Sequence, residues 1–301
     1  MGKTEVSIPL AESVKGEIVN ADSRQIYREL EIGTAKPTAE QMARVPHHFI
    51  NEKSICDRWT AGDFAKEGRR RIDEILSRGR VAVVVGGSML YLRALMDGFY
   101  DADLEECTDY GALREELEER GRDVLYAELQ QCDPELAART DPHDHHRMLR
   151  GLSVYRRLGM RLSELQTMPT KPMVHDFRLY FLHADRAETY TRVNRRAERM
   201  VDDGLTEEVQ ALMAIGFNET NCNALRTHGY QEVFPYLRGE ITRDQMIANI
   251  QQAVRHYVKR QLTWFRRDKR AIWIERRFDE PAEDVAARIA TNFFSPVIRQ
   301  E

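Results

Sequence analysis

Apolar residues in the first hundred positions follow two patterns, short continuous runs and helical spacing. The runs GEIVNA (16–21) and VAVVV (81–85) predict two strands, the second of the kind that is buried on both faces in a parallel sheet. Between them, residues 61–77 have helical periodicity and supply the crossover that parallel pairing requires. A glycine turn and the helical segment MLYLRALM (89–96) follow the second run. This order of elements indicates an α/β architecture.

After Gly98 the pattern changes to charged segments with helical spacing and no strand signal. These segments are 110–131, 134–138 and 146–165. Two prolines, at 169 and 172, then close the stretch. We therefore expect residues 104–172 to form an all-helical insertion.

A strand signal returns with the run FRLYFLHAD (177–185), which we expect to rejoin the sheet. Residues 186–265 have helical spacing throughout, and AIWI (271–274) predicts a last strand. The predicted fold is an α/β core with a parallel sheet, formed by residues 1–103 and 173–301 and interrupted by the helical insertion.

Length and composition are those of a globular protein, since 301 residues, 42% of them hydrophobic, fit one large domain or one domain with an insertion. No apolar run approaches the roughly 20 residues that span a bilayer, and the N-terminus lacks the layout of a signal peptide. We therefore expect no membrane association and a cytoplasmic location. The cysteines lack zinc-site spacing, so we expect buried free thiols at Cys56, Cys107, Cys132 and Cys222.

Charge is segregated along the chain, although the formal net charge is only -4. Nearly every charge from Asp101 to Glu119 is negative, whereas residues 255–277 carry nine Lys or Arg against Asp268 and Glu275. A basic stripe attracts a polyanion whatever the net charge, but a solvated helix face has the same composition. Charge alone leaves both interpretations open.

Gly2, Lys3 and Thr4 directly precede a segment with helical spacing and match the end of the phosphate-binding pattern GxxxxGK[ST]. In that pattern, amides at the helix N-terminus cradle phosphates, the lysine neutralises them and the hydroxyl binds Mg²⁺. The front half of the pattern is absent, so chance is an equally good explanation of three residues. Their position, one helix ahead of a strand that ends in an acidic residue, favours the phosphate interpretation.

Asp22 is that acidic residue, at the carboxyl end of the first predicted strand, where open α/β sheets bind their ligands. Its carboxylate could be a Mg²⁺ ligand, a general base or a helix N-cap. The turn Gly86-Gly87-Ser88 offers amides at a second helix N-terminus to an anionic backbone, or is an ordinary turn between strand and helix.

Two clusters of basic residues could contact anions. Arg192 and Arg196 lie four residues apart, on one helix face with Arg199, and can converge on one anion or pair with nearby glutamates. The other cluster comprises His143, His145, His146, Arg147 and Arg150. Neighbouring histidines in DPHDHH need not point the same way, so a phosphate-contacting surface or a plain loop explains this cluster better than a metal site.

Residues 20–50, NADSRQIYRELEIGTAKPTAEQMARVPHHFI, closely resemble the signature of the tRNA dimethylallyltransferases, also called tRNA isopentenyltransferases. Later segments follow in the family's order: VVVGGSMLYLRAL, HHRMLRGLSVY, RVNRRAERM, ALRTHGYQEVFPYLRGEIT and KRQLTWFRR. The resemblance covers the chain from Gly2 to about Arg267. It implies a monomeric enzyme with a core similar to P-loop kinases and NTPases. Such an enzyme transfers dimethylallyl from dimethylallyl diphosphate to N6 of adenosine 37 in the anticodon loop of tRNAs that read codons beginning with U.

The resemblance also implies roles for individual residues. Asp22 corresponds to the general base for the exocyclic amine, Gly2, Lys3 and Thr4 to the diphosphate site, with Thr4 at Mg²⁺, and one or both of Arg192 and Arg196 to the contact with the departing diphosphate. Gln25 and Tyr27 are candidates to read or stack on the target base. The residues implied in tRNA binding are Asp22, Ser23, Arg24, Gln25, Ser88, His146, Arg147, Met148, Leu149, Arg150, Arg226, Gly229, Tyr230, Lys259 and Arg260.

The chain departs from the family pattern in three places. It begins inside the phosphate loop, for which a misassigned start is the simplest explanation. Ser88 stands where the family usually has threonine, which keeps a hydroxyl, and Thr227-His228 replaces smaller or apolar residues, which could retune tRNA contacts. Two other functions are compatible with the residues, a nucleotide kinase or NTPase of the same fold and a tRNA-binding protein without catalysis.

Overall fold

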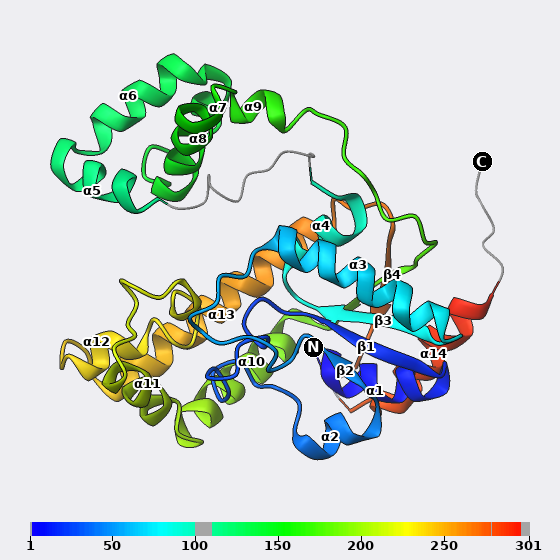
Figure 1. The fold of residues 1–301 in the computed structure, drawn as a ribbon. Coiled ribbons are helices and arrows are strands. Elements are labelled where there is room, and N and C mark those ends of the chain that lie inside the picture. The colour runs from blue at the N-terminus through cyan, green and yellow to red at the C-terminus, as the bar shows by residue number, and fades with distance from the viewer. Residues whose placement is uncertain (1, 100–109, 278, 296–301) are drawn as a thin grey trace. The chain divides into compact units, whose positions relative to one another are not determined.

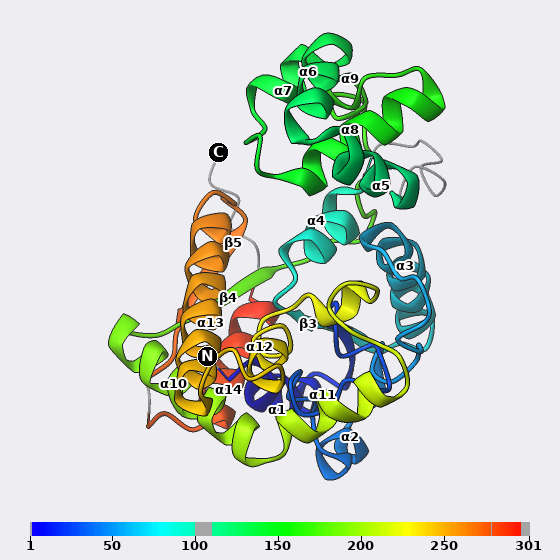
Figure 2. The ribbon, with the colours of Figure 1, turned by 90° about the vertical axis from the view of Figure 1, so that its left-hand side faces the viewer.

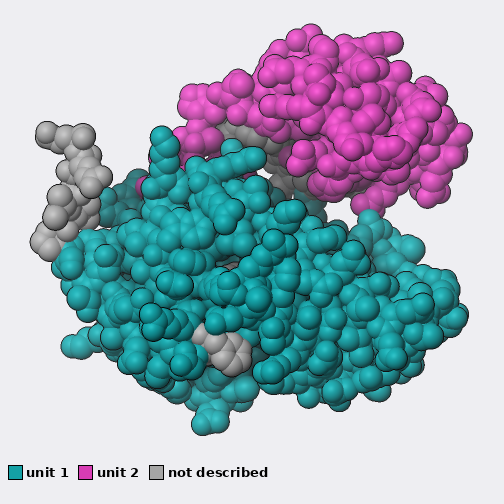
Figure 3. Space-filling view, turned by 180° about the vertical axis from the view of Figure 1, so that it is seen from behind, with its two compact units in different colours: residues 1–96, 174–301 teal, residues 97–173 magenta. Residues whose placement is uncertain are grey.

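The computed structural model describes residues 2–99, 110–277 and 279–295 (Figure 1). The chain divides into two compact units, the first made of residues 1–96 with 174–301 and the second of residues 97–173 (Figure 3).

The predicted insertion, 104–172, lies within the sequence of the second unit. Its residues 104–109, and with them Cys107 and part of the acidic run, lie outside the described residues.

The first unit has two layers of helices around parallel strands. Among its described residues the strands are β1 (Gly16–Ala21), β2 (His47–His48), β3 (Val81–Gly86), β4 (Leu179–His183) and β5 (Ala271–Glu275). The helices are α1 (Lys3–Ser13), α2 (Ala39–Arg44), α3 (Ala61–Ser77), α4 (Met89–Asp97), α10 (Arg186–Asp202), α11 (Leu205–Ala214), α12 (Val233–Leu237), α13 (Arg243–Phe265) and α14 (Ala282–Phe294), with a 3₁₀ turn, η2 (Asn223–Leu225).

All strand pairs are parallel, as predicted, but they form two sheets. The order β2-β1-β3 makes one sheet, and β4 pairs with β5 in another. The prediction that 177–185 rejoins the first sheet is therefore wrong. The backbone of β4 is paired with β5 from Leu179↔Ala271 to His183↔Glu275, and within the described residues no ladder joins β3 to β4.

β1 is the most buried strand because it lies in the middle of its sheet and is covered on both faces. Every residue of β1 is buried, whereas all of β3 is only half-buried, contrary to the expectation for VAVVV. The reason is that β3 is an edge strand of this sheet. β1 consequently offers two rigid ends at which a side chain can be held.

α1 and α3 cover opposite faces of this sheet (Figure 1). α1 is apolar on two sides: Ile8 and Ala11 pack against Ile18 of β1, while Val6 packs against Val285 of α14. α3 begins at a capping box in which the Thr60 and Asp63 side chains bond to each other's backbone amides, and it buries an apolar stripe. The bounds of α3 are those predicted from its periodicity.

The prediction that residues 186–265 are helical throughout is wrong. Residues 216–232 are mostly turns. Gly216 ends α11 with a φ of 94°, and the Asn218 side chain then accepts amide hydrogens from Thr220 and Asn221. Gly229, with a φ of 99°, turns the chain again before α12. This irregular segment carries side chains into the site described below.

The described part of the second unit is helical, as expected. It contains α5 (Gly111–Arg120), α6 (Arg122–Cys132), α7 (Pro134–Ala138), α8 (His145–Leu158) and α9 (Leu162–Leu165). Two of the predicted helices are each divided at a glycine with positive φ, Gly121 and Gly159. Leu125, Leu129 and Leu152 are fully buried, so this unit has a core of its own.

Cysteine burial follows the prediction in part. Cys132 and Cys222 are buried free thiols, but Cys56 is exposed because it lies in a turn directly after the buried Ile55. Among the described residues, no helix combines the length and the apolar character that crossing a bilayer requires.

Candidate active site

A cavity of about 540 Å³ opens in the first unit at the carboxyl ends of β1 and β3. Its lining residues come from the loop after β1, the start of α4, α10, the segment before α12, and α13. They are Asp22, Ser23, Arg24, Gly33, Thr34, Ser88, Met89, Leu90, Arg196, Arg226, Thr227, His228, Gln231, Ala253, His256, Tyr257 and Arg260. In both ribbon views the start of α1 lies next to α10 (Figures 1 and 2).

Asp22 is the only carboxylate among the cavity-lining residues that the structure describes. Its Oδ1 accepts the amide hydrogens of Arg24, at 2.9 Å, and Gln25, at 3.4 Å. The acid therefore caps a turn after β1, and no helix begins there. These bonds fix the direction of the carboxylate and leave its second oxygen available to the cavity.

Arg196 reaches the cavity from α10. Its guanidinium donates to the Thr34 carbonyl at 3.4 Å, and the buried Gln25 side chain donates to the same carbonyl at 3.0 Å. Desolvation lowers the pKa of Arg196 from its usual value and Asp22 opposes that shift, so the two side chains interact across the site. Arg192, one turn earlier, is not among the described residues that line the cavity.

Lys3 stands in the first turn of α1. Burial lowers the pKa of its ammonium group most, the charge of Arg196 lowers it further, and Asp22 raises it. The charges of Lys3, Arg196 and Asp22 therefore influence one another.

The N-terminus of α1 has no side-chain cap, and Gly2 before it has a left-handed φ of 67°. A side chain there would collide with Arg276, which donates to the Gly2 carbonyl at 3.3 Å and pairs with Glu5 at 2.7 Å. The first-turn amides and the Thr4 hydroxyl thus stand at a helix N-terminus, which attracts anions.

The glycine turn after β3 is held by α13. The Gly87 carbonyl accepts hydrogen bonds from the Tyr257 hydroxyl, at 2.6 Å, and from the buried Gln261 amide, at 2.8 Å. The Ser88 amide donates to the Ala21 carbonyl at 3.3 Å. That amide is used within the fold, so Ser88 can offer a ligand its hydroxyl but not a free backbone N–H.

Cations outnumber the acid around the cavity. Arg24 donates to the carbonyls of Ser23 and Asn223, and Arg260 lies over the Tyr257 ring at 5.6 Å. No carboxylate of the described residues forms an ion pair with Arg24, Arg196 or Arg260. The site therefore carries an uncompensated positive charge that suits a phosphorylated ligand.

Most other predicted site residues lie outside the lining. Gln25, Tyr230, Met148 and Leu149 have buried side chains; that of Gln25 bonds to backbone, and the Tyr230 hydroxyl donates to Glu208. They can shape the site or the helix that carries them, but their side chains do not face a ligand. Gly229 is buried, and Lys259 is exposed on α13. His146, Arg147 and Arg150 belong to α8 of the second unit, with His146 and Arg147 exposed.

Comparison with known proteins decides the family. The model of the IPP transferase family matches residues 25–268. The chain belongs to the IPP transferase family. The tRNA dimethylallyltransferase of Salinibacter ruber is 44% identical over 276 residues, which are 91% of this chain and 84% of that protein. A relative from Citrifermentans bemidjiense, tRNA dimethylallyltransferase 1, is 42% identical over 91% of this chain and 88% of its own.

Solved structures of the family have the same fold. The tRNA isopentenylpyrophosphate transferase of Bacillus halodurans matches with a TM-score of 0.69 and 33% identity, over 96% of this chain and 92% of its own. A eukaryotic dimethylallyltransferase, in crystallographic snapshots of its action on tRNA, matches with a TM-score of 0.81 and 25% identity. The match covers 99% of this chain and 78% of that one. The resemblance and the fold class expected from the sequence are confirmed, and membership makes the chain a prenyltransferase enzyme.

Prenyltransferases of this kind generally use a divalent metal, and the donor set of the site fits a hard cation. Asp22 offers carboxylate oxygens in the cavity, and Thr4 offers a hydroxyl in the first turn of α1. No group of three or more His, Cys, Asp or Glu in the described residues could hold a metal. Mg²⁺ needs no such group, because it is commonly bound through one or two protein oxygens, water and substrate phosphates.

The residues that hold the cavity wall give no signal in the sequence. Tyr257 and Gln261 are four apart on α13, the spacing of one helix face, but their common acceptor is 170 or more positions earlier in the chain. Arg276, which contacts Gly2, had no local signal either. His228 stood out only as a departure from the family pattern, and the structure adds that it lines the cavity.

Proposed function

We propose that this IPP transferase moves a dimethylallyl group from dimethylallyl diphosphate to N6 of adenosine 37 in tRNAs that read codons beginning with U, acting as a cytoplasmic monomer. The observation that carries the proposal is that Asp22, the one carboxylate among the described lining residues, shares the cavity with the unpaired cations Arg24, Arg196 and Arg260. Lys3, in the first turn of α1, interacts electrostatically with both Asp22 and Arg196. The names of the relatives, tRNA dimethylallyltransferases, support the same reaction.

In this proposal Asp22 is the general base. The exocyclic amine of adenine is a poor nucleophile, so it must lose a proton as its nitrogen bonds to the allylic carbon. Asp22 can take that proton on the oxygen that faces the cavity, because Oδ1 is engaged by the amides of Arg24 and Gln25. The bond between the allylic carbon and the diphosphate oxygen breaks in the same step, and diphosphate leaves.

Lys3, Thr4 and Arg196 are assigned to the diphosphate. Lys3 and Arg196 neutralise the charge that develops on the leaving oxygens, and the first-turn amides of α1 donate to them. Arg196 is preferred to Arg192 because it lines the cavity. Thr4, in the first turn of α1, is assigned to Mg²⁺, which would supply further charge neutralisation when bound.

The remaining basic residues are assigned to the tRNA. Arg24, Arg226 and Arg260 line the cavity, and Lys259, next to Arg260 on α13, is exposed. In the second unit, the exposed His146 and Arg147 at the start of α8 are assigned to the phosphate backbone. The target base is stacked within its loop, so it must be extruded to reach Asp22.

The reaction is tested by incubating the purified chain with unmodified tRNA, labelled dimethylallyl diphosphate and Mg²⁺. We expect one five-carbon unit per tRNA at adenosine 37, located by nuclease digestion and mass spectrometry. Two other results would refute the proposal: ATP hydrolysis or phosphoryl transfer without tRNA, which favours a kinase or NTPase, and salt-sensitive tRNA binding without product, which favours a binding protein.

A further inference from the structure

His228 presents an aromatic ring to the cavity that the mechanism above does not use. The imidazole lies against the Tyr257 ring, with centroids 4.7 Å apart and planes inclined by 31°. Tyr257 is itself fixed, because its hydroxyl donates to the Gly87 carbonyl at 2.6 Å. His228 is half-buried, so part of its ring surface is open to the cavity that Asp22 also lines.

The backbone around His228 holds the ring in place. The Thr227 carbonyl accepts the amide hydrogens of Tyr230, at 3.2 Å, and Gln231, at 3.0 Å. The Gly229 amide donates to the Glu232 carboxylate at 2.7 Å. The imidazole therefore sits on a tight turn between a fixed phenol ring and the cavity.

The surroundings keep this imidazole neutral. Burial lowers the pKa of His228 to about 4; Asp22 raises it, but Arg196, Arg260 and Arg24 lower it further. At neutral pH the ring is an uncharged aromatic surface in a cationic site. It adds nothing to the binding of diphosphate, whose charge needs cations, but it suits a flat neutral heterocycle.

We propose that His228 is the stacking platform for the extruded target adenine, with Tyr257 as the fixed ring beneath it. Stacking on an aromatic side chain is how proteins commonly hold single unstacked bases, and it would keep the amine within reach of Asp22. The cavity, at about 540 Å³, is within the usual size range of ligand pockets, about 300–1,000 Å³. This inference rests on the proposed function and assigns the base subsite within it.

Binding measurements test the platform without relying on catalysis. Two anticodon stem-loop RNAs are compared, one with adenine at the target position and one with an abasic residue there, both without dimethylallyl diphosphate and at fixed salt. His228→Ala should weaken binding of the adenine RNA roughly tenfold, the effect of losing one stacked base. Its affinity for the abasic RNA should equal that of the unmodified protein.

His228→Phe separates stacking from hydrogen bonding, because it keeps a ring and removes both ring nitrogens. We expect this variant to bind the adenine RNA as the unmodified protein does. His175→Ala, at an exposed histidine that pairs with Asp73, is the matched control and should bind both RNAs normally. Circular dichroism of each variant establishes that it is folded.

Two results would overturn the platform. An equal loss for both RNAs would place His228 at the RNA backbone, and a phenylalanine variant as weak as the alanine variant would make the ring nitrogens the binding groups. Failure of the proposed function is a different observation, namely no prenylated tRNA from the unmodified protein, and it leaves the adenine-versus-abasic comparison interpretable.

Discussion

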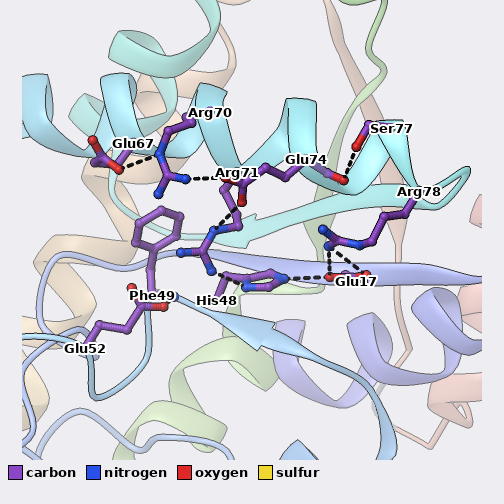
Figure 4. A network of polar contacts seen from close by, with 10 residues as sticks. All are labelled: Glu17, His48, Phe49, Glu52, Glu67, Arg70, Arg71, Glu74, Ser77 and Arg78. Atoms are coloured by element: carbon purple, nitrogen blue, oxygen red, sulfur yellow. Dashed lines mark hydrogen bonds and ion pairs between the residues drawn. The ribbon is translucent and has the colours of Figure 1, made fainter.

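The two ends of β1 each carry a carboxylate, and the protein surrounds them in opposite ways. At the amino end, Glu17 is only 4% exposed and accepts hydrogen bonds from His48, at 2.7 Å, and Arg78, at 2.9 and 3.0 Å (Figure 4). At the carboxyl end, Asp22 accepts two backbone amides, and among the described residues no basic side chain forms an ion pair with it.

The Glu17 end is a closed network in which each contact fixes the next. Arg71 donates to Nδ1 of His48 at 2.6 Å, and since a guanidinium can only donate, the ring proton of the neutral imidazole lies on Nε2. Nε2 therefore donates to Glu17 along the contact that Figure 4 draws between these two side chains. Arg80 adds charge at 3.7 Å. This network ties α3 and the loop after it to β1 and β2.

The comparison teaches how a buried strand end becomes a site. Glu17 is neutralised from within the chain, so it has nothing left to offer a ligand. Asp22 faces cations that the chain does not neutralise, so both the acid and the cations remain available to a ligand that brings its own charge. Incomplete compensation, rather than the presence of a carboxylate, distinguishes the end that we propose to be catalytic from the structural end.

Exchanging acid for amide at each end gives the largest expected effect. Asp22→Asn keeps an oxygen for the two backbone amides but cannot take a proton, so we expect kcat to fall about 10²- to 10⁴-fold with no loss of stability. Glu17→Gln should keep kcat near that of the unmodified protein. Prenylation kinetics and thermal unfolding of both variants measure this. A stable, fully active Asp22→Asn protein would remove the base assignment.

The next largest effect on kcat/KM is expected from replacing an arginine near each end of β1. Arg196→Ala removes a cation assigned to the leaving diphosphate and should lower kcat/KM about 10²- to 10³-fold, with partial recovery in Arg196→Lys, which keeps the charge. Arg78→Ala, at the Glu17 end, is the matched control and should leave kcat/KM unchanged. If the lysine variant were no better than the alanine variant, Arg196 would act through its bond to the Thr34 carbonyl instead.

Local patterns in the sequence predicted the elements well and their partners poorly. The bounds of β1 and α3 follow from a short apolar run and from helical periodicity, both of which are local patterns. The pairing of β4 with β5 alone is not local, because an apolar strand carries no information about which neighbour it will meet.

The same limit applies to the site. Asp22 and Ser88 could be predicted because carboxyl ends of parallel strands meet, and Arg196 because of helical spacing and the family resemblance. The clamp on Gly87, by which we mean the two hydrogen bonds that Tyr257 and Gln261 donate to its carbonyl, joins positions far apart in the chain. No periodicity in the sequence indicates it. The Glu17 network could not be predicted for the same reason. Arg78 follows α3 in the chain, whereas the carboxylate that it pairs with, Glu17, lies on β1 before that helix.

Glu17→Gln should cost stability in a pH-dependent way. Burial alone would raise the pKa of Glu17, but the hydrogen bonds from His48 and Arg78, together with the charge of Arg78, outweigh it and hold the pKa below its usual value. Because both arginines near Glu17 are about half exposed, we expect a loss of only about 2 kcal/mol at pH 7. Urea unfolding of the variant and the unmodified protein measures the difference.

The sign of the pH dependence follows from the direction of that shift. A lowered folded-state pKa stabilises the protein above the unfolded value, about 4.3, and this contribution is lost as pH falls through the folded value. The two unfolding free energies should therefore converge below about pH 4, since glutamine does not titrate. A difference that stayed constant with pH would mean that the carboxylate charge is not what the network stabilises.

The smallest expected effect tests the clamp that holds the wall beside Asp22. Burial raises the pKa of Tyr257 to about 12, so its hydroxyl is protonated and donates to Gly87. Tyr257→Phe removes that bond but keeps the ring under His228, and Gln261 still occupies the acceptor, so we expect a loss near 1 kcal/mol in stability. Gln261→Leu alone should behave similarly, and the double variant should lose more than the two single losses added, because the Gly87 carbonyl then has neither donor. Strict additivity of the unfolding free energies would show that the two side chains act independently, and Gly87 would not be their common target.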